Sequence, residues 1–131
     1  MAPDSPFSTE RLESFFDACN EHDIDRIGEF FTADGVYLAS VGPDDGGTSF
    51  LGVDEVRRGF TGFFAAYPDG NYTDVRVFVD GDRGMAQWTF SGTSATGERI
   101  SYRGVDVFEF VGDLISLKDA YRKERSRPIG S

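Results

Sequence analysis

Residues 102–121 read YRGVDVFEFVGDLISLKDAY, and this stretch contains the clearest strand pattern of the chain. Polar and apolar side chains alternate along its first half, and turn residues at 111–113 separate that half from a second apolar run. Successive side chains of a strand point to opposite faces, so the pattern predicts strands over 99–110 and 114–123 joined by a turn. One face of the first strand then carries Tyr102, Gly104, Asp106, Phe108 and Phe110.

Asp106 is the one carboxylate on this aromatic face. Burying a carboxylate costs free energy unless hydrogen bonds or a cation compensate it, and burial raises its pKa. Asp106 is therefore the first candidate site residue.

Upstream of residue 99 the chain predicts helices first and strands afterwards. Apolar residues follow helical spacing in three segments, which are 12–19, 24–31 and 53–67. Strand patterns cover a short segment between the helices and two segments after them, which are 36–41, 73–79 and 85–93. This order predicts an α+β fold with three N-terminal helices packed on one face of a mainly antiparallel sheet.

The length of 131 residues favours one domain over residues 1–131, with 1–7 as a loose leader and 124–131 as a basic tail. The formal net charge is −10, but residues 118–131 contribute +3 and the rest of the chain −13. An acidic body repels nucleic acid and anionic lipid, so we expect neither as a partner. The basic end either is a solvated tail or pairs with the body or with a second subunit.

The chain shows no membrane span and no signal-peptide pattern, so we expect a soluble, cytoplasmic protein. Its single cysteine, Cys19, excludes an intrachain disulfide and a cysteine-based zinc site, and its helical position predicts an inert core thiol. The single histidine, His22, lies between two predicted helices, where we expect a surface side chain. We expect no metal and no cofactor.

Three stretches resemble the SnoaL-like branch of the nuclear transport factor 2-like superfamily, which includes ketosteroid isomerase, limonene epoxide hydrolase and polyketide cyclases. They are FFDACNEHDIDRIGEFFTADGVYLASVG, MAQWTFSGTSATG and YRGVDVFEFVGDLISLKDAY. The resemblance implies a cone-shaped α+β barrel, in which a strongly curved sheet encloses a deep apolar pocket for a small apolar ligand or substrate. It also implies a homodimer.

The resemblance places Asp106 at the position of the oxyanion-hole aspartic acid of ketosteroid isomerase, which stays neutral and donates a hydrogen bond. The alternative is an aspartate that binds a neighbouring side chain at the base of the cone. The other isomerase roles are missing, because Phe15 stands in place of the oxyanion-hole tyrosine and Ala39 in place of the general base. Steroid isomerisation is therefore not expected.

The epoxide hydrolase site is missing as well. Gln87 and Thr89 replace its Arg-x-Asp pair, and Ala120 replaces its last aspartate. Tyr37 matches the tyrosine that helps to hold the catalytic water, and it stays a candidate catalytic residue beside Asp106.

The remaining candidates would line the pocket and bind the ligand. They are Phe15, Phe60, Phe64, Gln87, Thr89, Tyr102 and Phe108. In this register Gln87 and Thr89 face the interior of the cone. Trp88 and Phe90 then face outward, where a partner subunit would cover these two side chains. In the alternative register Trp88 belongs to the core.

Two functions stay open. One is an isomerase, cyclase or hydratase of an apolar carbonyl compound, with Asp106 as acid or hydrogen-bond donor and Tyr37, Tyr102 and Gln87 orienting the substrate. The other is a dimeric binding or scaffold protein without chemistry. A cone filled by its own phenylalanines would favour the second.

Overall fold

The structure contains a helix in each of the three segments where the spacing of apolar residues predicts one. The structure, a computed structural model that describes residues 6–129, contains α1 (Thr9–Asn20), α2 (Ile24–Glu29) and α3 (Val53–Ala66). The Ser8 hydroxyl accepts a hydrogen bond from the Arg11 amide at 3.0 Å, and the Asp23 carboxylate accepts one from the Arg26 amide at 3.2 Å. These caps supply partners for amides that the first turn of a helix leaves free.

The strands form one sheet with six members in the described part of the chain. They are β1 (Phe31–Leu38), β2 (Ser49–Leu51), β3 (Asn71–Asp80), β4 (Arg83–Thr93), β5 (Arg99–Val111) and β6 (Leu114–Arg122). Their order is β2-β1-β6-β5-β4-β3, and every neighbouring pair is antiparallel except β1 and β6, which run parallel. The sequence did not predict β2, and β1 begins five residues before the predicted strand.

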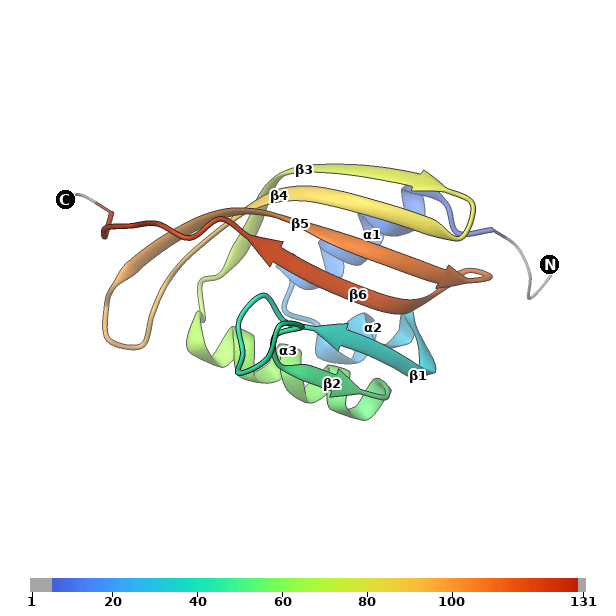
Figure 1. Cartoon of the computed structure of the whole chain (residues 1–131), viewed down its shortest axis with the longest axis horizontal. Coiled ribbons are helices and arrows are strands. Elements are labelled where there is room, and N and C mark those ends of the chain that lie inside the picture. The colour runs from blue at the N-terminus through green and yellow to red at the C-terminus, as the bar shows by residue number, and fades with distance from the viewer. Residues whose placement is uncertain (1–5, 130–131) are drawn as a thin grey trace.

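The helices cover one face of the sheet, as predicted (Figure 1). Helix α1 lies across the strands, α2 and α3 pack together, and α3 also contacts β1 and β2. The sheet curves around them without closing, because β2 and β3 remain as free edges. The α+β class with three helices on a curved, mainly antiparallel sheet is therefore confirmed.

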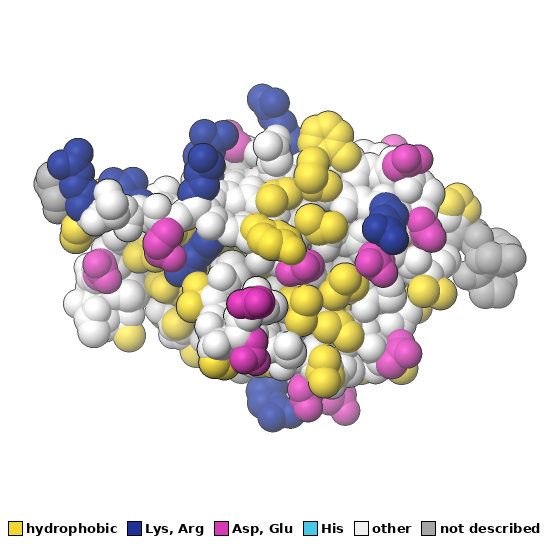
Figure 2. All heavy atoms as spheres, in the orientation of Figure 1, with side chains coloured by type: hydrophobic (Ala, Val, Ile, Leu, Met, Phe, Trp, Pro, Cys, Tyr) yellow, Lys and Arg dark blue, Asp and Glu magenta, His cyan; other side chains and the backbone are white. Residues whose placement is uncertain are grey.

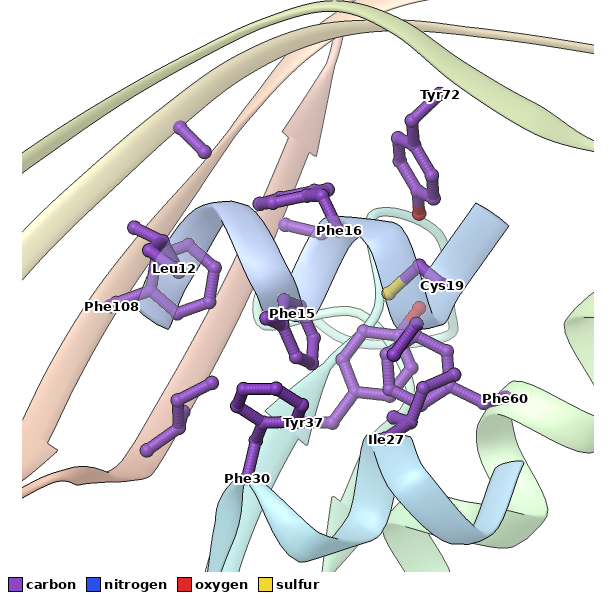
Figure 3. Packing of buried hydrophobic residues seen from close by; sticks show 14 of the residues in the cluster. Leu12, Phe15, Phe16, Cys19, Ile27, Phe30, Tyr37, Phe60, Tyr72 and Phe108 are labelled. Carbon is purple, nitrogen blue, oxygen red and sulfur yellow. The ribbon is translucent and has the colours of Figure 1, made fainter. Parts of the chain in front are cut away.

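The hydrophobic core lies between the helices and the inner face of the sheet (Figure 3). Phe15 of α1 is at its centre and has no solvent exposure. Its ring contacts five other phenylalanine rings at centroid distances between 5.3 and 6.3 Å, and these belong to Phe16, Phe30, Phe31, Phe60 and Phe108. Such edge-to-face packing adds to the free energy gained by burial and holds α1 to α2, β1, α3 and β5.

Phe7 belongs to this core, although the sequence analysis placed it in a loose leader. Its ring stacks on Phe110 with centroids 3.9 Å apart. Residues 1–5 of the predicted leader and 130–131 of the predicted tail lie outside the described residues. In residues 6–129, no helix combines the length and the apolar character that a membrane crossing requires.

The expected register of β4 is wrong. Ala86, Trp88 and Phe90 are buried on the inner face, and Gln87 and Thr89 lie on the outer face. Residues directly opposite each other in an antiparallel pair share a face, and Ala86 lies opposite Asp106 while Trp88 lies opposite Gly104. The aromatic face of β5 and the tryptophan face of β4 are thus one surface. Gly104 leaves room for the indole, because a Cβ there would collide with the ring of Trp88.

Candidate functional site

A buried ion pair lies on the inner face of the sheet. Lys118 Nζ donates a hydrogen bond to Asp106 Oδ1 at 3.1 Å, and Trp88 Nε1 donates one to Asp106 Oδ2 at 2.9 Å. The three side chains come from the neighbouring strands β6, β5 and β4. Lys118 lies opposite Phe108 and two residues from Ala120, which itself lies opposite Asp106. Strand pairing therefore brings the ammonium to the carboxylate.

Both oxygens of Asp106 already accept a hydrogen bond, so the carboxylate is bound to neighbouring side chains. This is the alternative that the sequence left open for Asp106. A buried charge that loses its partner is strongly destabilising, and here the partner is an ammonium within the same sheet.

The Lys118 ammonium has donors to spare. It has three N–H groups, and the described residues provide one hydrogen-bond acceptor for it, Asp106. Its Nζ also lies 4.5 Å from the ring centre of Tyr37 and 5.4 Å from that of Phe60, within cation–π range. The ammonium is thus held by a carboxylate and two ring faces, with N–H groups left for another acceptor.

The pKa values of the pair reflect burial and mutual attraction. Burial raises the pKa of Asp106, while the charge of Lys118 and the hydrogen bonds from Lys118 and Trp88 oppose the rise without cancelling it. Burial lowers the pKa of Lys118, but the negative charge of Asp106, the neighbouring Tyr37 and Cys19 and the hydrogen bond to Asp106 together outweigh it, so the net pKa of Lys118 is raised. Lys118 therefore keeps its proton at neutral pH.

A small cavity of about 30 Å³ lies beside the pair on the inner face. Lys118 and Trp88 line the cavity, whereas Asp106, to which both are hydrogen-bonded, does not. A second cation, Arg122, lines the cavity with its guanidinium 4.0 Å from the ring centre of Tyr102 and its Nε buried without a hydrogen-bond partner in the described residues. The lining residues are Tyr37, Ser40, Phe63, Tyr67, Tyr72, Trp88, Phe90, Tyr102, Lys118, Ala120 and Arg122.

The structure brings together only part of the residues predicted for the site. Tyr37 and Tyr102 line the cavity, and Tyr37 contacts Lys118, which binds Asp106. The four phenylalanines surround this region as packed core and do not line the cavity: Phe15, Phe60, Phe64 and Phe108. Gln87 and Thr89 lie on the opposite face of the sheet and are separated from Asp106 by it.

The sequence analysis did not identify the two cations that line the cavity, Lys118 and Arg122. Both were counted among the charges of a basic end, where a solvated side chain is the usual expectation. A signal existed in the alternation of β6, because Lys118, Ala120 and Arg122 share one face, and Ala120 had been matched to a catalytic position of a related enzyme. The single histidine, His22, lies between α1 and α2 as expected, but it is half-buried, because its ring stacks on Phe64 at 3.9 Å and contacts the Gly70 carbonyl at 2.7 Å.

Cys19 is buried, as predicted, and burial raises the pKa of its thiol, which keeps it protonated. Within residues 6–129, no three side chains of histidine, cysteine, aspartate or glutamate lie together in a way that could hold a metal ion.

A sequence model of the SnoaL-like domain matches residues 12–117, and no curated protein matches the chain. Similar solved structures include a candidate polyketide cyclase from Xanthomonas campestris, with 18% identity, a TM-score of 0.76 and coverage of 86% of this chain and 87% of the other. A protein with a ketosteroid isomerase-like fold from Catenulispora acidiphila, solved with trimethylamine, has 16% identity, a TM-score of 0.77 and coverage of 87% and 85%. A phenazine biosynthesis-related protein from Pseudomonas aeruginosa has 16% identity, a TM-score of 0.75 and coverage of 87% and 74%.

Proposed function

The chain belongs to the SnoaL-like domain family, and we propose that it binds an apolar carbonyl compound beside Lys118 and acts on it as an isomerase, cyclase or hydratase. The observation that carries the proposal is the Lys118 ammonium, which faces the inner cavity with unused N–H groups while Asp106 holds it from behind.

The ammonium would donate a hydrogen bond to the carbonyl oxygen of the ligand. Negative charge develops on that oxygen when the neighbouring carbon loses a proton or when a nucleophile adds to the carbonyl, and a fixed cation in a water-poor site stabilises it. Asp106 then acts through Lys118, because it keeps the ammonium protonated and aims it. Tyr37 and Tyr102, which line the same cavity, would orient the ligand.

The ligand needs more room than the cavity offers, because 30 Å³ is about the volume of one water molecule. Three lining residues, Tyr67, Tyr102 and Arg122, are only partly buried. Rotation of these side chains would enlarge the cavity towards solvent and leave the packed core around Phe15 unchanged.

The small cavity is also the observation that favours the second candidate, a binding or scaffold protein without chemistry. Phe15, Phe60 and Phe108 are fully buried and fill the centre of the cone. In either case we propose a homodimer formed through the outer face of the sheet, where Phe78, Met85 and Val107 form an exposed apolar row. A single buried free cysteine suits a reducing compartment, and we propose the cytoplasm.

The test uses Trp88, which is the only tryptophan and therefore gives a single indole N–H resonance in a nitrogen–proton NMR spectrum. Cyclic enones and aryl ketones are titrated against this resonance, and compounds that bind are assayed for turnover. We expect a saturable shift that Lys118→Met abolishes and that Lys123→Met, the matched change at an exposed lysine of the same end, leaves intact.

Turnover by the wild type, reduced about 100-fold or more in Lys118→Met, would support the enzyme. Saturable binding without turnover would support the second candidate. A resonance that no compound shifts would contradict a ligand site at Lys118. Sedimentation of the wild type and of Phe78→Glu tests the homodimer separately.

A further inference from the structure

The outer face of the sheet contains a groove of about 640 Å³, far larger than the inner cavity. Its lining residues come mainly from β3, β4, β5 and β6. The outer face of these strands lies on the side away from the helices (Figure 1). Gln87 and Thr89, which the sequence analysis expected inside the cone, line this groove. The other lining residues are Asp74, Arg76, Trp88, Arg103, Gly104, Val105, Tyr121, Arg122 and Lys123.

Strand pairing arranges the outward side chains of the groove in two rows. The first row crosses all four strands as Arg76, Gln87, Val105 and Tyr121. The second row runs from Thr89 to Arg103, whose carbonyl accepts a hydrogen bond from the Lys123 amide. Apolar and neutral polar groups thus lie between cations, on rigid strands instead of loops.

The charge of the groove is opposite to that of the chain. It contains four basic side chains and one carboxylate, Asp74, although the whole protein has a net charge of −10. Figure 2 shows Lys and Arg side chains on this face towards the C-terminal end, beside a band of hydrophobic side chains. Arg76, Arg103 and Lys123 make no salt bridge with any described residue.

Other surface arginines, such as Arg58 and Arg83, also lack a salt bridge among the described residues, so what distinguishes the groove is its balance of charge. Four cations line it with one carboxylate, on a chain that has 23 acidic residues. Like charges around one groove repel one another, and a bound anion reduces that repulsion. The groove therefore favours a negatively charged ligand.

We propose that this groove binds a small organic anion, a carboxylate or a phosphate attached to a flat apolar body. The guanidinium forks of Arg76 and Arg103 match the planar oxygens of such a group and can bind it bidentately. Val105 and the ring of Tyr121 offer an apolar surface for the body of the ligand, and Gln87 and Thr89 offer neutral hydrogen-bonding groups between them. The volume lies within the range of roughly 300–1,000 Å³ typical of small-molecule sites.

The site is independent of the pocket proposed at Lys118. Its outward row lies on the opposite face of the sheet, and neither Lys118 nor Tyr37 lines it, although Trp88 and Arg122 line both sites. The groove selects charge, whereas the inner pocket selects a carbonyl group.

The test titrates the protein with three probes in nitrogen–proton NMR spectra: 2-naphthoate, its neutral analogue 2-naphthamide, and inorganic phosphate. We expect 2-naphthoate to shift the amide resonances of Gln87, Thr89 and Val105 saturably and to bind at least 10-fold more tightly than 2-naphthamide. Phosphate that shifts the same amides would show that a phosphoryl group is accepted. Phosphate that shifts none of them while 2-naphthoate does would show that the apolar body is required.

The double variant Arg76→Gln/Arg103→Gln is expected to weaken 2-naphthoate at least 10-fold. Arg83→Gln, an exposed arginine of β4 outside the groove, is expected to leave the affinity unchanged. All three arginines belong to strands of the same sheet, and thermal melts of both variants confirm that the fold is retained.

Equal affinity for 2-naphthoate and 2-naphthamide, unchanged affinity in the double variant, or shifts confined to other residues would overturn the proposal. So would sedimentation in which the wild type is a dimer and the double variant a monomer, because the cations would then belong to a subunit interface.

Discussion

Lys118 Nζ lies 3.1 Å from Asp106 Oδ1, and the exposed fractions of the two side chains are 1% and 0%. The contact joins the last strand of the chain to the strand that precedes it, in the middle of an aromatic core. An ion pair in such a place is a weak source of stability, since the cost of removing two charges from water offsets their attraction. Because Lys118 also lines a cavity, the position of the pair favours a role in ligand binding over a role in stability. The contribution of the pair to the free energy of unfolding can be measured.

Asp106→Asn is expected to lower the free energy of unfolding by about 3–5 kcal/mol, because it leaves the Lys118 ammonium buried without a counter-charge. The double variant Asp106→Leu/Lys118→Met is expected to lose much less, since neither charge remains. Urea denaturation measures both, and Asp119→Asn, one residue beyond Lys118 on β6, serves as the control. A double variant as unstable as the single one would show that the pair itself stabilises the fold.

The stability contributed by Lys118 is expected to depend on alkaline pH. The charge of Asp106 raises the pKa of Lys118 in the folded state despite burial, so folding favours the protonated ammonium. This contribution is fully present below the pKa of a lysine in the unfolded chain and is lost as pH rises through the folded pKa. Denaturation curves between about pH 8 and pH 12 should show a steeper decline in the wild type than in Asp106→Leu/Lys118→Met, in which the other buried groups with raised pKa values, such as Cys19 and Tyr72, remain. Parallel curves for the two proteins would contradict the assignment.

Gly104→Ala is expected to destabilise the protein by about 1–3 kcal/mol, because the added Cβ would collide with the Trp88 ring and the Tyr121 carbonyl. Gly62→Ala is the matched control. Gly62 is an exposed position of α3 with open space around its Cα, where alanine should stabilise the helix by about 0.5–1 kcal/mol. Thermal melts of the two variants should therefore move in opposite directions, and a neutral Gly104→Ala would show that the indole can move aside.

Asp69 is expected to hold the end of β4 more firmly at neutral pH than in acid. Its carboxylate accepts hydrogen bonds from the Thr93 amide at 2.7 Å and the Thr93 hydroxyl at 2.9 Å, and these bonds lower its pKa. A lowered pKa means that the contribution is present above the ordinary pKa of aspartate and is lost as pH falls through the folded value. Hydrogen exchange at Thr93 should become faster in Asp69→Ala, with little change at Met85 in the same strand. Equal protection of Thr93 in the variant would show that strand pairing alone holds this end.

The elements of this fold could be predicted because periodicity is local information. The positions of Leu12, Phe15, Phe16 and Cys19 are enough for an amphipathic helix, and the alternation around Asp106 is enough for a strand. The three-residue strand β2 is too short to produce a period, and the sequence pattern predicts no element for it.

The faces of the sheet were harder to predict, because alternation separates two faces without saying which is buried. In β4 and its neighbours both faces carry apolar side chains, with Trp88 and Phe90 inside and Phe78, Met85 and Val107 outside. Lys118 was missed for a related reason. Its burial depends on Asp106, which is 12 residues earlier in the chain, and only the pairing of β5 with β6 brings the two together.

The position of β6 has a consequence for the order in which a growing chain can become stable. This strand lies between β1 and β5 and is their common neighbour, so β1 and β2 are hydrogen-bonded to the larger part of the sheet only through it. During synthesis Asp106 and the aromatic face around it are made before Lys118 exists. Contacts between distant parts of a chain form slowly because they require the closure of long loops. Until β6 is in place the protein has an unpaired carboxylate and two further open strand edges, on β1 and β5, at which wrong strand pairing can start.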